Sequence, residues 1–235
     1  MWNQKKKAVT FSFDDGVLQD IRVIEILNKY GLKGTFNINS GYLGRPNQLN
    51  RNGRDVDHTK VSADDLKKCY QGHEIAVHTI THPNLVELDE EEIIWQVEND
   101  RRALSYLCGY EVVGMAYPFG MTDERVVQIM KEHTKVQYAR TVESTHRFDL
   151  QTEDLLTYNP TVYFIEDCFE QIVDAFLESE SDDLQLLYIW GHAYELDAAY
   201  ITWEKFERIC KKLAGRPDIF YGTNNEVLLQ RDGIG

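Results

Sequence analysis

Residues 8–16 read Ala-Val-Thr-Phe-Ser-Phe-Asp-Asp-Gly, an apolar run that ends in two adjacent carboxylates and a glycine. The β-branched and aromatic side chains at 8–13 favour a buried strand. Asp14 and Asp15 follow directly, and an unpaired charge at the end of a buried strand is costly. The two carboxylates must therefore be solvated, ion-paired or bound to a cation. Gly16 allows the chain to turn sharply there, so this strand end is a candidate site.

A second strand-like run, 74–77, ends directly before the segment His78-Thr79-Ile80-Thr81-His82. Two imidazoles four residues apart face the same way on a helical turn. With one aspartate they make three of the ligands that an open, catalytic divalent-metal site requires. Neither motif is specific alone, because Asp-Asp-Gly often forms a solvated turn and a histidine pair can arise by chance. Their shared position at strand ends predicts a metal site.

Strand-like and helix-like segments alternate along the chain. Strands are expected at 8–13, 34–39, 74–77, 112–117, 136–140, 161–164, 184–190 and 219–221. Helices are expected between Gly16 and Tyr30 and at 62–70, 89–107, 123–133, 167–178 and 203–213. Residues 41–60 have the polar composition of a long substrate-facing loop. Repeated β-then-α units predict an α/β fold with seven or eight parallel strands in a closed or nearly closed barrel, with residues 1–235 as a single domain.

Composition limits the classes of partner. The net charge of −14 argues against nucleic acid and against a strongly anionic polymer as substrate. Four cysteines without Cys-x-x-Cys spacing indicate reduced thiols in a cytoplasmic protein. Residues 1–7 lack the apolar stretch of a signal peptide, and no segment is long enough to span a membrane. We therefore expect a cytoplasmic protein without a membrane partner, rather than a secreted one whose signal peptide has been removed; the pattern does not indicate an oligomeric state.

Four motifs, in order, resemble those of the polysaccharide deacetylase superfamily, the NodB-homology domain of carbohydrate esterase family 4. Residues 10–16 are similar to its Thr-Phe-Asp-Asp-Gly motif, and residues 78–82 to its His-Ser/Thr-x-x-His motif. Residues 117–120, Tyr-Pro-Phe-Gly, resemble the end of its Arg-x-Pro-Tyr/Phe-Gly motif. Residues 190–192, Trp-Gly-His, resemble its late Leu-x-His motif. The resemblance extends over residues 8–221.

The resemblance implies a distorted (β/α) barrel in which Asp15, His78 and His82 bind a divalent metal, most often zinc. Asp14 would be the general base and His192 the general acid. The segment Tyr117, Pro118 and Phe119 would support the substrate, with a backbone N–H near Tyr117 helping to hold the oxyanion.

The chain departs from the family pattern at the position of the motif's arginine, which usually holds the catalytic aspartate. Ala116 stands there. Arg140, at another expected strand end, is a candidate to replace it by contacting Asp14. The alternative is a surface arginine paired with Glu143.

Three other positions keep alternatives open. Trp190 stands where a leucine commonly lines the acetyl pocket, and it is either part of a remodelled acyl pocket or a core residue. Glu195 and Glu143 are the candidates for a carboxylate that tunes His192. The remaining histidines lack metal-ligand spacing and are interpreted as polar surface or loop residues: His58, His73, His133 and His146.

The leading functional hypothesis is a metal-dependent hydrolase that removes an acyl group, with N-acetyl as the first choice, from a sugar or oligosaccharide. A second keeps the fold but takes a small non-sugar amide or cyclic amide as substrate in a C–N hydrolase reaction. A third is a non-catalytic, ligand-binding member of the family. The retention of Asp14, Asp15, His78, His82 and His192 argues against the third.

Overall fold

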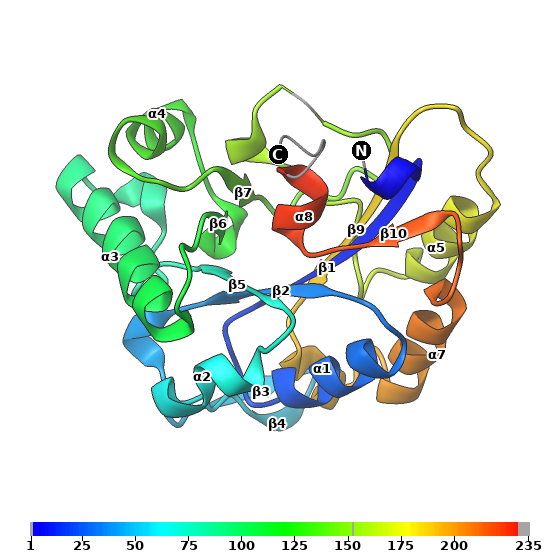
Figure 1. Cartoon of the computed structure of the whole chain (residues 1–235). Helices are drawn as coiled ribbons and strands as arrows, with labels where there is room; N and C mark the ends of the chain where they lie inside the picture. Colours follow the sequence, from blue (N-terminus) through cyan, green and yellow to red (C-terminus); the bar gives the residue numbers. More distant parts are fainter. Residues whose placement is uncertain (1, 152, 230–235) are drawn as a thin grey trace.

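The computed structural model describes residues 2–151 and 153–229, which are organised around one curled parallel sheet (Figure 1). The strand order is β7-β6-β5-β2-β1-β9-β8, and β10 pairs with the start of β1. Every pairing in this sheet is parallel. The strands are β1 (Lys7–Asp14), β2 (Gly34–Ile38), β5 (Glu74–Val77), β6 (Gly114–Ala116), β7 (Tyr138–Arg140), β8 (Val162–Tyr163), β9 (Gln185–Gly191) and β10 (Ile219–Tyr221).

The segment 158–163 brings the two edges of the sheet together. Tyr158 forms a parallel bridge with Arg140 at the end of β7, and Val162 and Tyr163 pair with β9 a few residues later. The result is the distorted (β/α) barrel that the alternating pattern and the family resemblance predicted.

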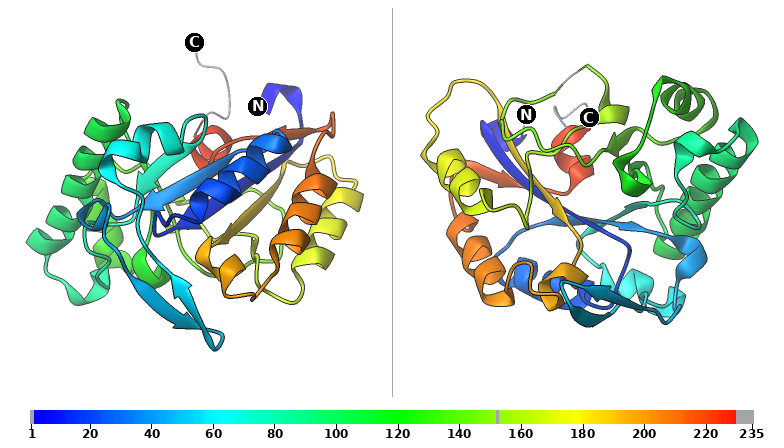
Figure 2. Two further views of the ribbon diagram at one scale, coloured as in Figure 1. Left: turned by 90° about the horizontal axis from the view of Figure 1, so that it is seen from below. Right: turned by 180° about the vertical axis from the view of Figure 1, so that it is seen from behind.

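The longer helices lie on the outside of the sheet, whereas α8 packs against its inner face, where Asn224 contacts Thr10 and Tyr188 (Figures 1 and 2). Their bounds are α1 (Asp20–Lys29), α2 (Ala63–Cys69), α3 (Glu90–Cys108), α4 (Glu124–His133), α5 (Phe169–Glu178), α6 (Tyr194–Asp197), α7 (Trp203–Leu213) and α8 (Asn224–Leu228). The long helix α3 begins with a capping box at Asp89 and ends at Gly109, whose φ is 84°. A capping box at the first turn and a glycine with positive φ after the last turn are common ends of an α-helix.

The two faces of β1 have opposite character, because successive side chains of a strand point to opposite sides. Phe11 and Phe13 point outward and pack against Phe206 of α7, with ring centroids 6.2 and 6.1 Å away. Thr10 and Ser12 instead join a buried hydrogen-bonded network inside the barrel: Asn224 accepts from Thr10 at 2.8 Å, and Asn37 donates to Ser12 at 2.9 Å. From Thr10 onward, the inward face of β1 is therefore polar, and it ends at Asp14.

The segment 41–60, predicted as a long substrate-facing loop, lines the cavity but is not a loop throughout. This segment contains a two-stranded antiparallel hairpin, β3 (Gln48–Arg51) and β4 (Arg54–Asp57), which is separate from the main sheet and has its turn against the end of α6 (Figure 2). Asn52 and Gly53 form its turn with φ values of 52° and 70°. Asn-Gly is the pair that two-residue hairpin turns with positive φ prefer, so the signal was present in the sequence.

The four cysteines are free thiols, as predicted. Within residues 2–151 and 153–229, no helix combines the length and the apolar character that crossing a bilayer requires. The cytoplasmic location stays a prediction.

Candidate metal centre and active site

Asp15 occupies the tight turn that ends β1. Its backbone has a φ of 85°, and Gly16 follows with a φ of 62°. A Cβ atom at Gly16 would lie 3.0 Å from Cγ2 of Ile38, so glycine is needed for space as well as for conformation. A positive φ at an aspartate is uncommon and costs energy. The turn therefore holds the Asp15 carboxylate where a regular strand would not place it.

The two histidines of residues 78–82 lie in a loop and not on the helical turn that their spacing suggested. Thr79 and His82 have φ values of 67° and 55°, which break any helical path. The buried carboxylate of Asp100 in α3 holds the loop by accepting from the His78 backbone N–H at 3.1 Å. The two imidazoles still meet, with centroids 4.7 Å apart and nearly perpendicular planes.

Asp15, His78 and His82 bring three potential ligand atoms to one point. The Asp15 Oδ1 atom lies 4.0 Å from Nε2 of each histidine, and all three ligand atoms lie within 4.8 Å of one another. The ring Nδ1 of His78 lies 2.8 Å from the carbonyl oxygen of Ala116. Because a carbonyl can only accept, Nδ1 carries the proton, and Nε2 presents its lone pair to the space that it shares with Asp15 and His82. This is the usual support of a metal-binding histidine.

Burial keeps these histidines in the form that binds metal. It lowers the pKa of His78 to about 4 and also lowers the pKa of His82. Both rings are therefore neutral near pH 7, as a ligand imidazole must be. Two imidazoles and one carboxylate with room for further ligands is a donor set that fits zinc or a similar divalent ion.

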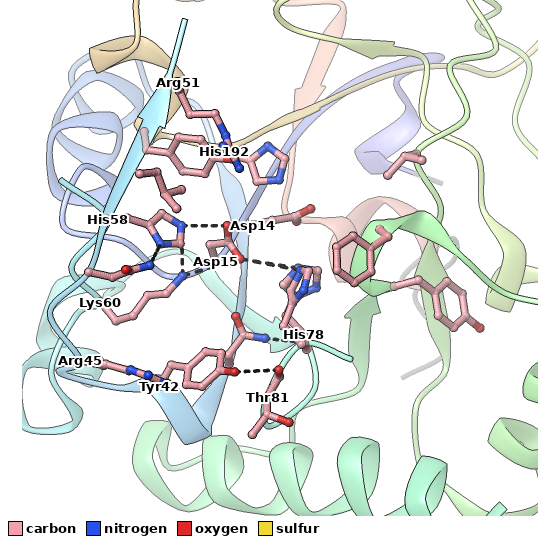
Figure 3. Close-up of a pocket in the computed structure, with 18 of the residues that line it drawn as sticks. Asp14, Asp15, Tyr42, Arg45, Arg51, His58, Lys60, His78, Thr81 and His192 are labelled. Atoms are coloured by element: carbon pink, nitrogen blue, oxygen red, sulfur yellow. Dashed lines mark hydrogen bonds and ion pairs between the residues drawn. The ribbon is translucent and has the colours of Figure 1, made fainter. Parts of the chain in front are cut away.

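His58 is a member of this site that the sequence interpretation missed, because it was assigned to the surface. It is 8% exposed, and its Nε2 lies 3.1 Å from Oδ2 of Asp15 (Figure 3). Asn47 donates to the other ring nitrogen at 3.1 Å, so Nε2 is the donor to Asp15. Lys60 places its ammonium 3.6 Å from Oδ1 of Asp15. Burial would raise the pKa of Asp15, but His58 and Lys60 hold it well below its usual range.

Arg140 contacts Asp14, as predicted. Its Nη2 donates to Oδ1 of Asp14 at 2.6 Å and also contacts Oδ2. The guanidinium group is fully buried, which rules out the alternative of a surface pair with Glu143. Asn37 donates a further hydrogen bond to Asp14 at 2.8 Å. Burial would raise the pKa of Asp14, but the charge and hydrogen bond of Arg140, together with the nearby histidines, outweigh it and keep that pKa below its usual value.

His192 follows β9 and has a carboxylate partner, Glu195. Oε2 of Glu195 lies 3.4 Å from Nδ1 of His192 and accepts from its backbone N–H at 3.0 Å. Tyr163 donates its hydroxyl proton to the other oxygen of Glu195. Burial lowers the pKa of His192, but Glu195 outweighs that effect and raises it to about 9. Of the two candidates for this role, Glu195 is thus the one in contact with His192.

These groups surround a cavity of about 820 Å³. Asp14, Asp15, His78, His82 and His192 line it together with Tyr117, Phe119 and Trp190. Pro118 is buried beside them. Trp190 is both a cavity wall and a packed residue: its ring stacks on Tyr163 at 4.1 Å, and the Arg140 guanidinium lies 4.5 Å from its centroid.

The three remaining histidines differ in burial and in their neighbours. His73 lies in the turn before β5, in keeping with the interpretation as a surface or loop residue, but it is buried and accepts from the backbone N–H of Gly34 at 3.1 Å. His133 is exposed. His146 is also exposed, but it lies beside Glu166 and Cys168, and these three residues form a second group of possible metal ligands outside the cavity.

Comparison with known proteins decides the family. The sequence profile described as polysaccharide deacetylase matches residues 2–138, which is more than half of the chain. The chain belongs to the polysaccharide deacetylase family. A chitooligosaccharide deacetylase from Azorhizobium caulinodans is 25% identical over 133 residues, covering 55% of this polysaccharide deacetylase family member and 56% of that relative. The match therefore spans little more than half of the curated relative.

Two solved structures share the fold of this polysaccharide deacetylase family member. The peptidoglycan deacetylase PdaC from Bacillus subtilis is 18% identical with a TM-score of 0.57, and the alignment covers 97% of this chain and 91% of that one. A family 4 carbohydrate esterase pseudoenzyme from Bacillus anthracis is 17% identical with a TM-score of 0.56, covering 95% of this chain and 66% of that one. Because one of the two is a pseudoenzyme, the fold alone does not decide whether this member is active.

Proposed function

We propose that this polysaccharide deacetylase family member is a zinc-dependent hydrolase that removes an acyl group, most readily N-acetyl, from a sugar or oligosaccharide. The observation that carries the proposal is the convergence of Asp15, His78 and His82 beside two further groups, Asp14 and His192, that lie in opposite electrostatic environments. Pairs of titratable groups whose surroundings push their pKa values apart are typical of acid–base sites.

Asp15, His78 and His82 would hold the ion. A divalent ion bound there supplies Lewis acidity, because it acidifies water and polarises an acyl oxygen. Asp14 is kept ionised by Arg140 and is therefore suited to accept a proton from the attacking water. Asn37 and Arg140 hold its carboxylate from behind, which leaves the remaining direction toward the cavity.

His192 has the complementary role. Its pKa of about 9 keeps the imidazole protonated near neutral pH, so it can donate a proton to the leaving nitrogen as the carbon–nitrogen bond breaks. Glu195 orients the ring, and Tyr163 in turn holds Glu195. Water adds its oxygen to the acyl carbon, one proton passes to Asp14, and the amine leaves with the proton from His192.

A second candidate function is hydrolysis of a small non-sugar amide. It is favoured by Trp190, which lines the cavity as a large, fixed side chain where the family commonly has leucine. A bulky wall there suits a different acyl group from acetyl.

The test is a hydrolysis screen with zinc-reconstituted protein. Acetylated chitooligosaccharides and acetylated xylan are compared with small cyclic amides, and acetate or amine release is measured. Release of acetate from the sugars supports the proposal, and turnover of the amides alone supports the second candidate. Turnover of neither would contradict both and favour a non-catalytic member.

A further inference from the structure

The β3–β4 hairpin forms one wall of the cavity. Its turn is fixed to the barrel, since Asn52 donates to the carbonyl oxygen of Ala198 at 3.1 Å. Its far end is fixed as well, because the ring of His58 packs edge-on against Tyr194 with centroids 5.0 Å apart. This wall therefore has a defined position relative to Asp15 (Figure 3).

Two arginines line the cavity here: Arg51 at the end of β3, and Arg45 in the segment just before β3. Arg45 lies over the ring of Tyr42 at 5.1 Å. Arg51 donates to the backbone oxygen of Asn50 at 3.1 Å. Among the described residues, neither guanidinium group has a carboxylate within ion-pair distance. Arg22, Arg54, Arg125 and Arg216 share that property, but of the described arginines only Arg45 and Arg51 line the cavity.

The acidic side chains of the cavity already have partners other than Arg45 and Arg51. Of the described lining residues, only Asp14 and Asp15 are acidic. Arg140 neutralises Asp14 from behind, and Asp15 belongs to the metal set. The chain as a whole has a net charge of −14. The two guanidinium groups without a carboxylate partner make this part of the cavity positively charged instead. Charge of one sign in a cleft focuses the field and attracts a ligand of the opposite sign.

We infer that the substrate carries anionic groups of the carboxylate class, which Arg51, beside His192, and Arg45, beside Tyr42, recognise at two separate points of the cavity (Figure 3). The inference rests on the proposed function and narrows it from acylated sugars to acylated sugar acids. A guanidinium group offers a planar set of donors that matches a carboxylate, and it stays charged at any physiological pH. The overall charge of the chain disfavours a long anionic polymer, but this wall favours a short anionic oligosaccharide.

The test compares substrates that differ only in this charge. Hyaluronan tetrasaccharide alternates uronates with N-acetylated sugars, and its carboxyl methyl ester keeps the shape without the charge; chitotetraose is the neutral reference. We expect the acid to exceed the ester in kcat/KM by about tenfold, through KM and not kcat, because hydrogen bonds to charged groups are among the stronger ones. Raising the salt concentration should reduce the ratio, since exposed charges are screened.

The variants are Arg45→Gln, Arg51→Gln and their combination, and the matched control is Arg54→Gln. Arg54 lies opposite Arg51 in the hairpin and is exposed, but it does not line the cavity. The double variant should bring the acid-to-ester ratio close to one while hydrolysis of chitotetraose persists, and Arg54→Gln should keep the ratio. Equal turnover of acid and ester by the unmodified protein, or a ratio that survives the double substitution, would overturn the inference.

Failure of the proposed function gives a different result. If no oligosaccharide is hydrolysed, binding of the same acid and ester is measured by calorimetry. Tighter binding of the acid that is lost in the double variant supports the arginine subsite even without turnover. Binding that does not distinguish acid from ester, or no binding of either, overturns it.

Discussion

Asp14 and Asp15 are neighbours in the sequence but have different surroundings. Asp14 ends a strand and points into the barrel, where Arg140 and Asn37 contact it. Asp15 lies in a turn with positive φ. It faces His78 and His82 on one side and His58 and Lys60 on the other. The different partners are the reason for assigning proton transfer to one carboxylate and metal binding to the other.

The Asp14→Asn substitution tests this division at the residue scale. The amide keeps the shape of the side chain but cannot accept a proton, so we expect kcat to fall by about 10²–10⁴-fold. Zinc affinity, measured by titration, should stay close to that of the unmodified protein. Lost zinc binding combined with near-normal residual turnover would show that the two aspartates have the reverse roles.

The Glu195→Gln substitution tests the proposal that His192 is the general acid. Activity of a general acid is lost as pH rises through its pKa, and Glu195 raises the pKa of His192 to about 9. Removing that negative charge should lower the pKa, so the basic limb of the pH profile of kcat should move to lower pH. The acidic limb, measured in the same series, serves as the internal reference. An unmoved basic limb would contradict the role assigned to the pair.

At the scale of elements, the strands and most helices follow from local patterns, but the connections that form the site do not. The helix α3 was predicted from its apolar stripe, its capping residue and Gly109. The loop 78–82 was interpreted as a helical turn from spacing alone, whereas Thr79 and His82 adopt positive φ and Asp100 holds the loop from another element. The hairpin does not follow from the polar composition of its segment, because only the turn pair Asn52-Gly53 marks it.

Gly16 and Gly31 offer a matched pair for testing the turn after β1. Both have positive φ, 62° and 66°, but a Cβ at Gly31 meets nothing within 4 Å, whereas at Gly16 it meets Ile38 at 3.0 Å. Replacement by alanine should cost about 1–2 kcal/mol at Gly31 from backbone conformation. At Gly16 overpacking should add about 1–3 kcal/mol.

Urea unfolding measures both costs, and zinc titration gives the functional readout. We expect zinc affinity to fall in Gly16→Ala, because the turn places Asp15, and to be unchanged in Gly31→Ala. Equal costs and equal zinc affinities would mean that the Gly16 turn does not position the ligand.

At the scale of the whole molecule, barrel closure explains which contacts could be anticipated. The parallel strands place their carboxyl ends at one rim, so Asp14, His78, Arg140 and His192 could be assigned to one site from the order of elements. His58 could not, because it reaches Asp15 from a hairpin outside the barrel. The polar side of β1 could not be interpreted from the sequence either, because Asn224, which accepts from Thr10, comes from α8 at the other end of the chain.

Arg140→Ala belongs to this scale, because the residue joins β7 to β1 across the barrel. Removing one partner of a buried pair leaves an uncompensated charge, and we expect a loss of about 3–5 kcal/mol in the free energy of unfolding. Arg140→Lys keeps the charge without the planar fork, so it should lose less stability but still lower kcat. The free energy of unfolding is measured in urea, and kcat by steady-state kinetics, for both variants. If Arg140 supports Asp14 as proposed, Arg140→Lys recovers much of the lost stability but not kcat. Equal recovery of both would indicate that Arg140 contributes only general packing.

The most direct measurement of the central claim is acetate release from an N-acetylated oligosaccharide while zinc is titrated into metal-free protein. Cys168→Ser is included in every protein, so that the second group of possible ligands does not affect the stoichiometry. The account expects no release in chelator, release that rises to a plateau at about one zinc per chain, and neither binding nor release in Asp15→Asn. Acetate release that persists in chelator, or zinc bound as tightly by Asp15→Asn as by its parent, would contradict it.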